Sequence, residues 1–539
     1  MKLSGNVVDV LNSRIYPAIL EISDGRIVDI KETRDKYENY IIPGFVDSHI
    51  HIESSMLTPS EFGRVAVIHG TVAALSDPHE IANVLGIEGI KYMIEDAKKS
   101  PLKFYFGAPS CVPASDFETN GATIRAKEIE GLMKMDEIKF LGEVMNFHGV
   151  IRGEKEIIEK IKIARKFSKV IDGHAPGLRG ENLKKYISAG ISTDHECFSK
   201  EEALEKIKYG MEILIREGSA AKNFDELVSL IEKYPEKCMF CSDDKHPNDI
   251  VKAHINEMVK RALEYRIDLM KVLRVACVNP VLHYNLNLGL LQRDDYADFL
   301  IVDKNFNVLK TFINGKLVAE NGKTKISRVV PRIVNNFNIE TINIEDLILE
   351  CRGERINVIK VVENQIITEK FTAVPKVIGN EVVSDTERDI LKIVVVNRYK
   401  KSKPVIGFVN GFGLKQGAIA SSISHDSHNI VAVGVEDKYL CEAINLIIKN
   451  KGGISLVSEN KKSILPLPIA GILSPEPYMD VANKYEKIDK DSKSLGSRLE
   501  APFMTLSFMA LPVIPKLKIT DKGLFEVEKL KFVDVFENI

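Results

Sequence analysis

The chain has 539 residues, which is enough for two or three domains with cores of their own. Its 74 lysine and arginine residues nearly balance 76 aspartate and glutamate residues, so the charge excludes a strongly basic surface for nucleic acid or anionic lipid. Hydrophobic residues make up 45% of the chain, as in a folded globular protein. With no apolar run of membrane-spanning length and no signal-peptide core, we expect a cytoplasmic protein.

Residues 1–40 alternate short apolar runs with turns, including a predicted hairpin around Ser23-Asp-Gly-Arg26. From Tyr40 the pattern changes to apolar runs that alternate with helical stretches, which indicates a parallel sheet. Thr58-Pro-Ser-Glu61 predicts the start of the first helix, with Thr58 as the N-cap and Glu61 completing a capping box. A strongly periodic helix is predicted near residues 155–167.

Eight apolar runs predict the strands of this sheet. They lie at residues 40–46, 71–75, 103–106, 138–141, 170–174, 191–195, 211–215 and 237–240. Eight βα units within about 245 residues match the size of a (β/α)₈ barrel. The predicted fold class is therefore α/β, with a TIM-type barrel over residues 41–287.

The flanks of the barrel predict two further domains. Residues 288–344 return to short strands, with an Asn314-Gly315 hairpin, and we expect them to complete a small β-sandwich begun by residues 1–40. Residues 345–539 combine strand-like runs with a helix predicted over 437–449, which indicates a C-terminal α+β domain.

Two histidines stand two residues apart where the first predicted barrel strand ends, at His49-Ile50-His51. Because side chains alternate between the faces of a strand, His49 and His51 project to the same side. One such pair is weak evidence of a metal site by itself. Further ligand-type residues follow the apolar cores of four other strands: Glu143, His174, His195 and Asp243.

The ends of barrel strands converge at the C-terminal face, where active sites of this fold lie. Taken singly, a strand-end histidine can be ordinary polar lining, and a carboxylate can cap the next helix. Six ligand-type residues at the ends of five strands favour a metal centre over these local roles. Four histidines and two carboxylates are the ligand set for two divalent ions, with one carboxylate able to bridge them.

Four further motifs stand out in the chain: Pro43-Gly-Phe-Val-Asp-Ser-His-Ile-His51, Ser76-Asp-Pro-His-Glu80, Ala297-Asp-Phe-Leu-Ile-Val-Asp303 and Ser424-His-Asp-Ser-His-Asn429. The first and third resemble the opening and closing signatures of the amidohydrolase superfamily. The second and fourth are far more specific and resemble its adenine deaminase family. The resemblance runs from the barrel into the last domain and so covers essentially the whole chain.

The resemblance implies a purine-salvage hydrolase that converts adenine and water to hypoxanthine and ammonia, and we expect a homo-oligomer. It implies two divalent ions, Mn²⁺ or Fe²⁺ in preference to Zn²⁺. By family analogy one ion is held by His49, His51, Glu143 and Asp243, and the other by Glu143, His174 and His195. Asp243 is also the expected proton acceptor from the attacking hydroxide.

Other residues near these strand ends have two interpretations. His79 and Glu80 fit proton transfer or purine binding, against a local turn or capping role. Asp244 either orients Asp243 or starts the next helix. Weaker candidates for contacts with the substrate are Ser54, Ser55 and Arg216.

The Ser-rich turn that contains His425 and His428 is open to two readings, a loop that reaches the barrel mouth or a hydrogen-bonded turn. Three alternatives to the preferred function also stay open. One is a barrel hydrolase acting on guanine, cytosine, adenosine or a cyclic amide, although cyclic-amide hydrolases usually carry a modified lysine where Glu143 stands. The second is a non-catalytic interaction protein, which is disfavoured because all six ligand positions carry ligand-type residues. The third is a metal store.

Overall fold

The computed structural model describes residues 1–362 and 365–537. They divide into two compact units, each described here by itself. The first unit comprises Met1–His79, Lys91–Cys111 and Ile124–Val330, and the second comprises Glu80–Ile90, Val112–Thr123 and Pro331–Ile539. Two short segments from within the expected barrel range therefore belong to the second unit. Among the described residues, no helix has both the length and the apolar composition that a membrane crossing needs.

The first unit contains a ring of eight parallel strands. They are β5 (Phe45–Ile50), β6 (Thr71–Ser76), β7 (Lys103–Ala108), β8 (Ile138–Val144), β9 (Val170–Gly173), β10 (Thr193–Asp194), β11 (Glu212–Arg216) and β12 (Cys238–Cys241). Neighbouring strands pair in the order β5 to β9 and β10 to β12. Ser192 N donates to Ile171 O (3.0 Å) between the two groups, and Asp243 N donates to His49 O (2.9 Å) to close the ring. The predicted barrel is confirmed.

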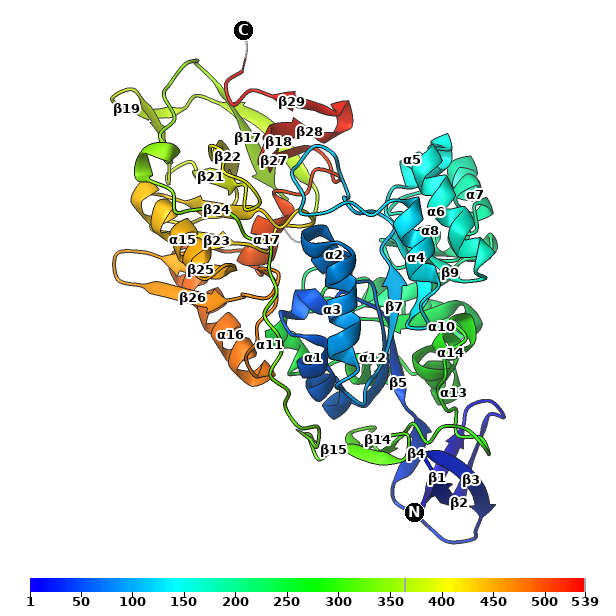
Figure 1. Cartoon of the computed structure of the whole chain (residues 1–539). Helices are drawn as coiled ribbons and strands as arrows, with labels where there is room; N and C mark the ends of the chain where they lie inside the picture. The colour runs from blue at the N-terminus through cyan, green and yellow to red at the C-terminus, as the bar shows by residue number, and fades with distance from the viewer. Residues whose placement is uncertain (363–364, 538–539) are drawn as a thin grey trace. The chain divides into compact units, whose positions relative to one another are not determined.

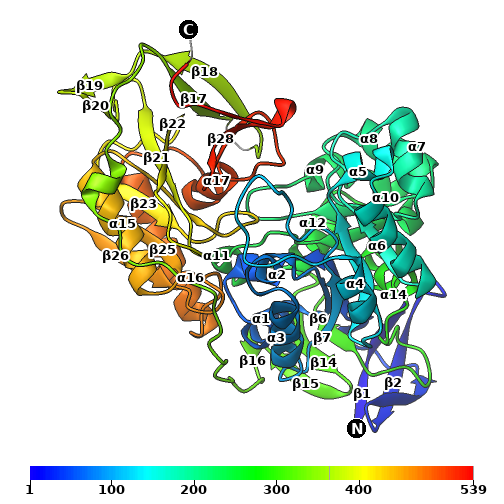
Figure 2. The same ribbon diagram turned by 45° about the horizontal axis from the view of Figure 1, so that its top comes forward.

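Helices alternate with these strands, and those of the first unit cover the outside of the barrel. Figure 2 shows α6, α7 and α8 in this layer. The bounds are α1 (Pro59–Ala66), α2 (His79–Leu85), α3 (Ile87–Ala97), α4 (Ala126–Met133), α5 (Phe147–Arg152), α6 (Lys155–Lys166), α7 (Gly180–Ser188), α8 (Lys200–Lys208), α9 (Phe224–Leu227), α10 (Leu230–Lys233), α11 (Pro247–Ile250), α12 (Ile255–Glu264), α13 (Leu269–Leu273) and α14 (Asn279–His283).

Two local predictions for this region are wrong. The run expected as one strand over 40–46 forms two strands, β4 (Tyr40–Pro43) and β5, separated by Gly44. A side chain at Gly44 would place its Cβ 2.3 Å from Val72 Cγ2, so only glycine fits this junction. The capping box before α1 does not form, since the Thr58 side chain caps nothing and Glu61 pairs with Arg64 Nη1 at 2.9 Å.

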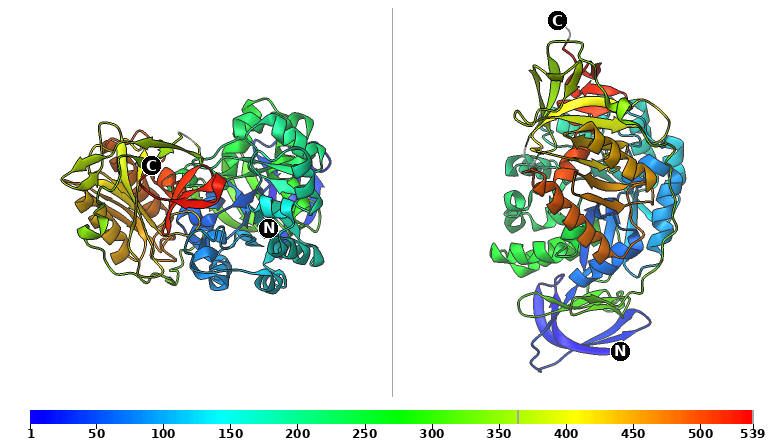
Figure 3. Two further views of the ribbon diagram at one scale, coloured as in Figure 1. Left: turned by 90° about the horizontal axis from the view of Figure 1, so that it is seen from above. Right: turned by 90° about the vertical axis from the view of Figure 1, so that its left-hand side faces the viewer.

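Strands from both flanks of the barrel form a single eight-stranded sheet in the first unit (Figure 1). Its order is β16 (Lys323–Thr324), β15 (Lys316–Glu320), β14 (Val308–Ile313), β13 (Phe299–Val302), β4, β1 (Lys2–Asp9), β2 (Arg14–Ser23) and β3 (Arg26–Glu32). The pairing of β4 with β13 joins the two flanks. Phe299 and Phe312 stack at 4.7 Å in its core, and the right-hand view of Figure 3 shows the blue N-terminal strands beside the green later ones.

The second unit is built on a mixed eight-stranded sheet with helix α15 (Asp437–Lys449) against it, and the prediction of this helix is confirmed. The sheet order is β18 (Thr368–Ala373), β17 (Ile356–Val361), β22 (Val405–Asn410), β21 (Ile390–Val396), β24 (Ile430–Gly434), β23 (Ala418–Ser421), β25 (Gly453–Val457) and β26 (Lys462–Pro466). Ile444 and Ile447 of α15 pack on Val394 and Ala432. The remaining elements are β19 (Lys376–Ile378), β20 (Glu381–Val383), α16 (Tyr478–Ser494), α17 (Pro502–Phe508), β27 (Leu517–Thr520), β28 (Gly523–Glu526) and β29 (Lys531–Val533).

Candidate metal centre

His49 and His51 lie at the end of β5 with their ring nitrogens facing one another, 3.2 Å apart at Nε2. Both side chains are buried. His51 Nδ1 lies 3.0 Å from the carbonyl oxygen of Asp77, which accepts its proton and fixes the tautomer. His51 Nε2 is therefore directed at the other strand ends. Two imidazole nitrogens that face each other can hold a cation between them once both are deprotonated.

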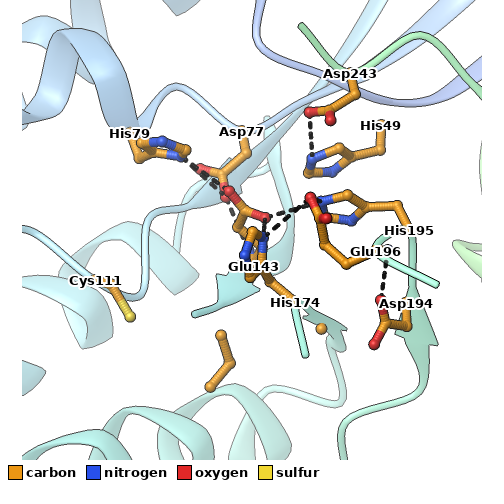
Figure 4. Close-up of polar contacts among 12 residues, drawn as sticks. His49, Asp77, His79, Cys111, Glu143, His174, Asp194, His195, Glu196 and Asp243 are labelled. Carbon is orange, nitrogen blue, oxygen red and sulfur yellow. Dashed lines mark hydrogen bonds and ion pairs between the residues drawn. The ribbon is translucent and has the colours of Figure 1, made fainter. Parts of the chain in front are cut away.

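Glu143, at the end of β8, reaches histidines from both sides of the cluster (Figure 4). Its Oε2 lies 2.8 Å from His174 Nδ1 and 3.1 Å from His195 Nε2. Its Oε1 lies 3.5 Å from His51 Nε2. One carboxylate thus faces donors that belong to two groups, as a bridging ligand must.

Asp243 follows β12 and completes the cluster next to the His49–His51 pair. Its Oδ1 lies 3.2 Å from His51 Nε2 and 3.7 Å from His49 Nε2. Arg216 Nη1 donates to its other oxygen, Oδ2, at 2.6 Å. The backbone φ of Asp243 is +51°, a conformation that costs a non-glycine residue free energy and is concentrated at functional sites.

The donor atoms have the spacing of ligands that share an ion. Atoms about 2.1 Å from one metal ion lie about 3.0 Å apart at right angles and about 3.4 Å apart in a tetrahedron. The nitrogen and oxygen atoms described above are separated by 2.8 to 3.7 Å. Groups with all their donor atoms within 4.8 Å of one another include His49, His51 and Glu143; Glu143, His174 and His195; His49, His195 and Asp243; His51, Asp243 and Asp244; and Asp77, His79 and Glu143. The residues present therefore fit two divalent ions.

The cluster keeps its carboxylates ionised despite complete burial. Burial opposes ionisation of Glu143, but the charge of His174 and hydrogen bonds from His174 and His195 hold its pKa well below the usual range. For Asp243, burial is likewise outweighed by the charge of Arg216 and a hydrogen bond from His51, and its pKa is also well below normal. Burial lowers the pKa of His174, but Glu143 and Glu196 more than compensate and raise it to about 9. Metal binding must then displace a proton from His174.

His79 is brought to the same cluster from the end of β6. Its Nδ1 lies 3.6 Å from Glu143 Oε1 and 3.8 Å from Asp77 Oδ2, and its ring meets that of His51 edge-on with centroids 4.5 Å apart. Asp77 itself accepts a hydrogen bond from Glu143 N at 2.8 Å. A side chain at Gly142 would put Cβ 2.2 Å from Asp77 Oδ2, so this contact requires glycine there.

Glu80 and Ser54 have other partners, whereas Asp244 offers a donor atom within 4.8 Å of those of His51 and Asp243. Glu80 belongs to the second unit, where its two carboxylate oxygens contact His425 Nδ1 and His428 Nε2. The turn containing these two histidines therefore holds a buried carboxylate. The Ser54 hydroxyl donates to Asp244, which ties the turn after β5 to the end of β12.

Ser55 and Arg216 are engaged by the protein. The Ser55 hydroxyl donates to Ile52 O at 2.6 Å within its own 3₁₀ turn. Arg216 Nη2 donates to Glu196 Oε2 at 3.1 Å, and Nη1 contacts both Glu196 and Asp243. Asp77 and Glu196 were not among the predicted site residues. Asp77 stands within the Ser76-Asp-Pro-His-Glu80 motif, and Glu196 directly follows His195 at a strand end, and these positions were the available sign.

The chain has been compared with known proteins. A model of the amidohydrolase family matches residues 40–318, and a model of the adenine deaminase C-terminal domain matches residues 365–531. The adenine deaminase of Sulfurovum sp. (strain NBC37-1) is 52% identical over 537 residues, covering 99% of each chain. The adenine deaminase of Methanosarcina mazei is 49% identical over 550 residues, again covering 99% of each chain.

The barrel, its buried strand-end ligands and the match over residues 40–318 define an amidohydrolase, a class that implies a divalent metal. Sequence identity of about one half to adenine deaminases over the full length, together with the match of the last domain, identifies the family within this class. The chain belongs to the adenine deaminase family.

Proposed function

We propose that this chain catalyses the hydrolytic deamination of adenine, which gives hypoxanthine and ammonia, at a centre of two divalent ions. Relatives of this family that align over 99% of both chains support the substrate. The observation that carries the centre is the position of Glu143, whose Oε1 faces His51 and whose Oε2 faces His174 and His195.

In this proposal the two ions share Glu143. One is held by His49, His51, Glu143 and Asp243, and the other by Glu143, His174 and His195. Bound divalent ions lower the pKa of water and so supply a nucleophile near neutral pH. Imidazole and carboxylate donors without thiolate are compatible with Mn²⁺, Fe²⁺ and Zn²⁺. We propose Mn²⁺ or Fe²⁺, with Zn²⁺ as an alternative.

Asp243 is proposed as the acceptor of the proton that the attacking water loses. Adenine C6 gains an oxygen and its amino group departs as ammonia, so one proton must move from the water to the departing nitrogen. Arg216 holds Asp243 Oδ2 at 2.6 Å, which turns Oδ1 toward the histidine pair. A carboxylate fixed in this way takes up the proton and passes it on without leaving its place.

His79 and Glu80 are proposed to supply the second proton function, at the purine ring nitrogens. His79 supports this role because its Nδ1 lies 3.6 Å from Glu143, within the cluster. Glu80 is the next residue in the chain, and its two carboxylate oxygens contact the imidazoles of His425 and His428. A ring nitrogen that receives a proton makes C6 a better electrophile, which an aromatic amidine requires.

The remaining candidates are proposed to support the site. Asp244 and Ser54 orient the segment after β12, as their hydrogen bond suggests. Arg216 acts on Asp243 and Glu196, and its contacts favour this role over direct contact with adenine. Ser55 is retained as a candidate for substrate binding through the turn in which it lies.

The proposal is tested by ammonia release from adenine, adenosine, guanine and cytosine, using metal-free protein loaded with Fe²⁺, Mn²⁺ or Zn²⁺ in turn. We expect release from adenine, with two ions bound per chain and the highest turnover with Fe²⁺ or Mn²⁺. Failure to release ammonia from adenine with any of the three metals would overturn the substrate. Release from a different base alone would reassign it.

Three further features belong to the proposal. They are a homo-oligomeric state, a cytoplasmic location, and a division into a small β domain (1–40 and 288–344), a catalytic barrel (41–287) and a C-terminal domain (345–539). Light scattering at micromolar concentration tests the first. Fractionation of the source cells tests the second, and limited proteolysis at the proposed boundaries tests the third.

A further inference from the structure

A second carboxylate faces the His174–His195 side of the centre. Glu196 directly follows His195 beyond β10, and only 4% of its surface is exposed. Its Oε1 lies 3.5 Å from His195 Nε2 and 3.7 Å from His174 Nδ1 (Figure 4). These are the same two nitrogens that Glu143 Oε2 approaches.

Arg216, at the end of β11, fixes the orientation of the Glu196 carboxylate. Its Nη2 donates to Glu196 Oε2 at 3.1 Å, and its Nη1 contacts Glu196 Oε1. Asn223 in turn donates through Nδ2 to the carbonyls of His195 (3.0 Å) and Cys197 (3.2 Å) and accepts from Arg216 N (2.7 Å). The backbones that carry the arginine and the glutamate are therefore locked to each other.

This pair places charge where it affects metal binding. A buried guanidinium beside two divalent cations would repel them, and the interaction is strong because little water screens it. Glu196 offsets that repulsion, since its carboxylate lies against both the guanidinium and the histidine nitrogens. Arg216 also reaches Asp243, so the same cation touches carboxylates on both sides of the centre.

We propose that Glu196 is a positioning residue of the metal centre, which retains the ion on the His174–His195 side while Arg216 holds its carboxylate in place. The inference rests on the proposed two-metal ligand set. It assigns Glu196 no part in proton transfer. Its effect is on the occupancy and affinity of one ion, so it is measurable without turnover.

The test compares Glu196→Gln, Arg216→Met and the double variant with the parent protein. Each is loaded with Mn²⁺ and dialysed against a graded series of chelator concentrations. Bound metal is then determined by elemental analysis, and the electron paramagnetic resonance spectrum distinguishes spin-coupled ion pairs from single ions. Glu202→Gln is the matched control, because Glu202 is another buried barrel carboxylate and bonds Lys206 rather than the histidines.

We expect Glu196→Gln to weaken binding of the second ion about tenfold to a hundredfold and to convert the coupled spectrum to that of a single ion. Arg216→Met should retain the second ion better than Glu196→Gln does, because it removes a repelling charge. The double variant should bind it more tightly than Glu196→Gln alone, since the uncompensated guanidinium is gone. The control should hold two ions like the parent.

Two results would overturn the inference while leaving the centre intact. One is a Glu196→Gln protein that binds both ions as the parent does. The other is equal loss of the second ion in Glu196→Gln and Arg216→Met, which a purely structural role of the pair predicts. A parent protein that binds fewer than two ions would instead overturn the proposed centre, and the inference with it.

Discussion

Each of the two compact units buries a cluster of histidines and carboxylates, and the two clusters differ in what the ring nitrogens face. In the first unit His49 Nε2 and His51 Nε2 face each other at 3.2 Å, and Glu143 spans several imidazoles. In the second, His425 and His428 each point at a different oxygen of Glu80. Imidazole nitrogens that converge on one another and on shared carboxylates suit a metal ion, whereas the two nitrogens that face Glu80 each have a carboxylate oxygen as hydrogen-bond partner.

Two features define the second cluster further: the protonation of His428 and the hydrogen bonds of a buried arginine, Arg398. Ser424 N donates to His428 Nδ1 at 3.4 Å, so the neutral ring carries its proton on Nε2 and donates it to Glu80. Burial lowers the pKa of His428, in keeping with a neutral ring. Arg398 Nη1 donates to His428 O at 3.2 Å, and its Nη2 donates to Ala470 O at 2.6 Å. The turn whose histidines contact Glu80 is thus stabilised by hydrogen bonds from Arg398, a residue of the same unit.

The contrast between the two clusters predicts the largest loss of activity for substitution of Glu143, the carboxylate that faces several imidazoles of the first cluster. Glu143→Gln keeps the size of the side chain but removes the charge shared by the two proposed ions. We expect loss of both bound metal and turnover, the latter by about three orders of magnitude or more, because several kcal/mol of charge stabilisation is lost. Metal content and ammonia release are measured on the same sample. Full metal content and activity would exclude a bridging role.

His79→Asn tests a residue that lies beside the metal ligands without belonging to the proposed set. Turnover should fall about a hundredfold to ten-thousandfold, as expected for removal of a general acid or base, while two ions stay bound. Unchanged turnover would remove His79 from the proton chemistry. Loss of an ion together with activity would instead make His79 a ligand.

Glu80→Gln tests the second cluster and should separate it from the first. We expect turnover to fall about a hundredfold, with His425→Asn and His428→Asn causing smaller losses of about tenfold, because the carboxylate keeps one of its two donors. All three variants should retain two ions. His283→Asn is the matched control, since its Nδ1 lies 3.2 Å from a different carboxylate, Glu212. An equal loss of turnover in His283→Asn would mean that the effect of Glu80→Gln reflects the stability of the fold and not a specific role of the second cluster.

The first cluster could be predicted from the sequence because the fold imposes a rule on it. The carboxyl ends of the barrel strands meet at one face, so ligand-type residues at several strand ends, such as His49, Glu143 and Asp243, had to converge. The rule does not give the direction of a side chain, and for that reason Glu196 and Asp77 were missed. Gly44, which divides one predicted strand into β4 and β5, was missed because its reason is the close approach of Val72.

The second cluster follows no such rule. Glu80 and His428 are 348 positions apart and lie on elements that share no repeat, so their contact depends on how the last unit folds. Sequence could show only that His425 and His428 lie three apart in a polar turn. Likewise, the capping box at Thr58 had the right residues, but Glu61 pairs with Arg64 instead, and local pattern cannot rank two such partners.

Two buried lysines extend the contrast between the units. Burial favours the neutral amine of Lys206 in the first unit, but Asp194 and Glu202 outweigh it and raise its pKa. Among the described residues, Lys518 in the second unit donates only to carbonyls, those of Ile366 and Phe508, both at 2.9 Å. Burial lowers the pKa of Lys518 to about 7.

Lys518→Met therefore gives the smallest and most specific predicted effect, a change in the pH dependence of stability. Between about pH 7 and the usual lysine pKa near 10.4, the unfolded chain binds a proton at this position that the folded chain lacks. The free energy of unfolding of the parent should consequently rise with pH across this window, relative to the variant, by about 2 to 3 kcal/mol between pH 7 and pH 9. Chemical denaturation of both proteins at pH 7, 8 and 9 measures the difference, with the exposed Lys401→Met as control. Parallel curves for parent and Lys518→Met would mean that the folded protein keeps this amine charged, as it does Lys206.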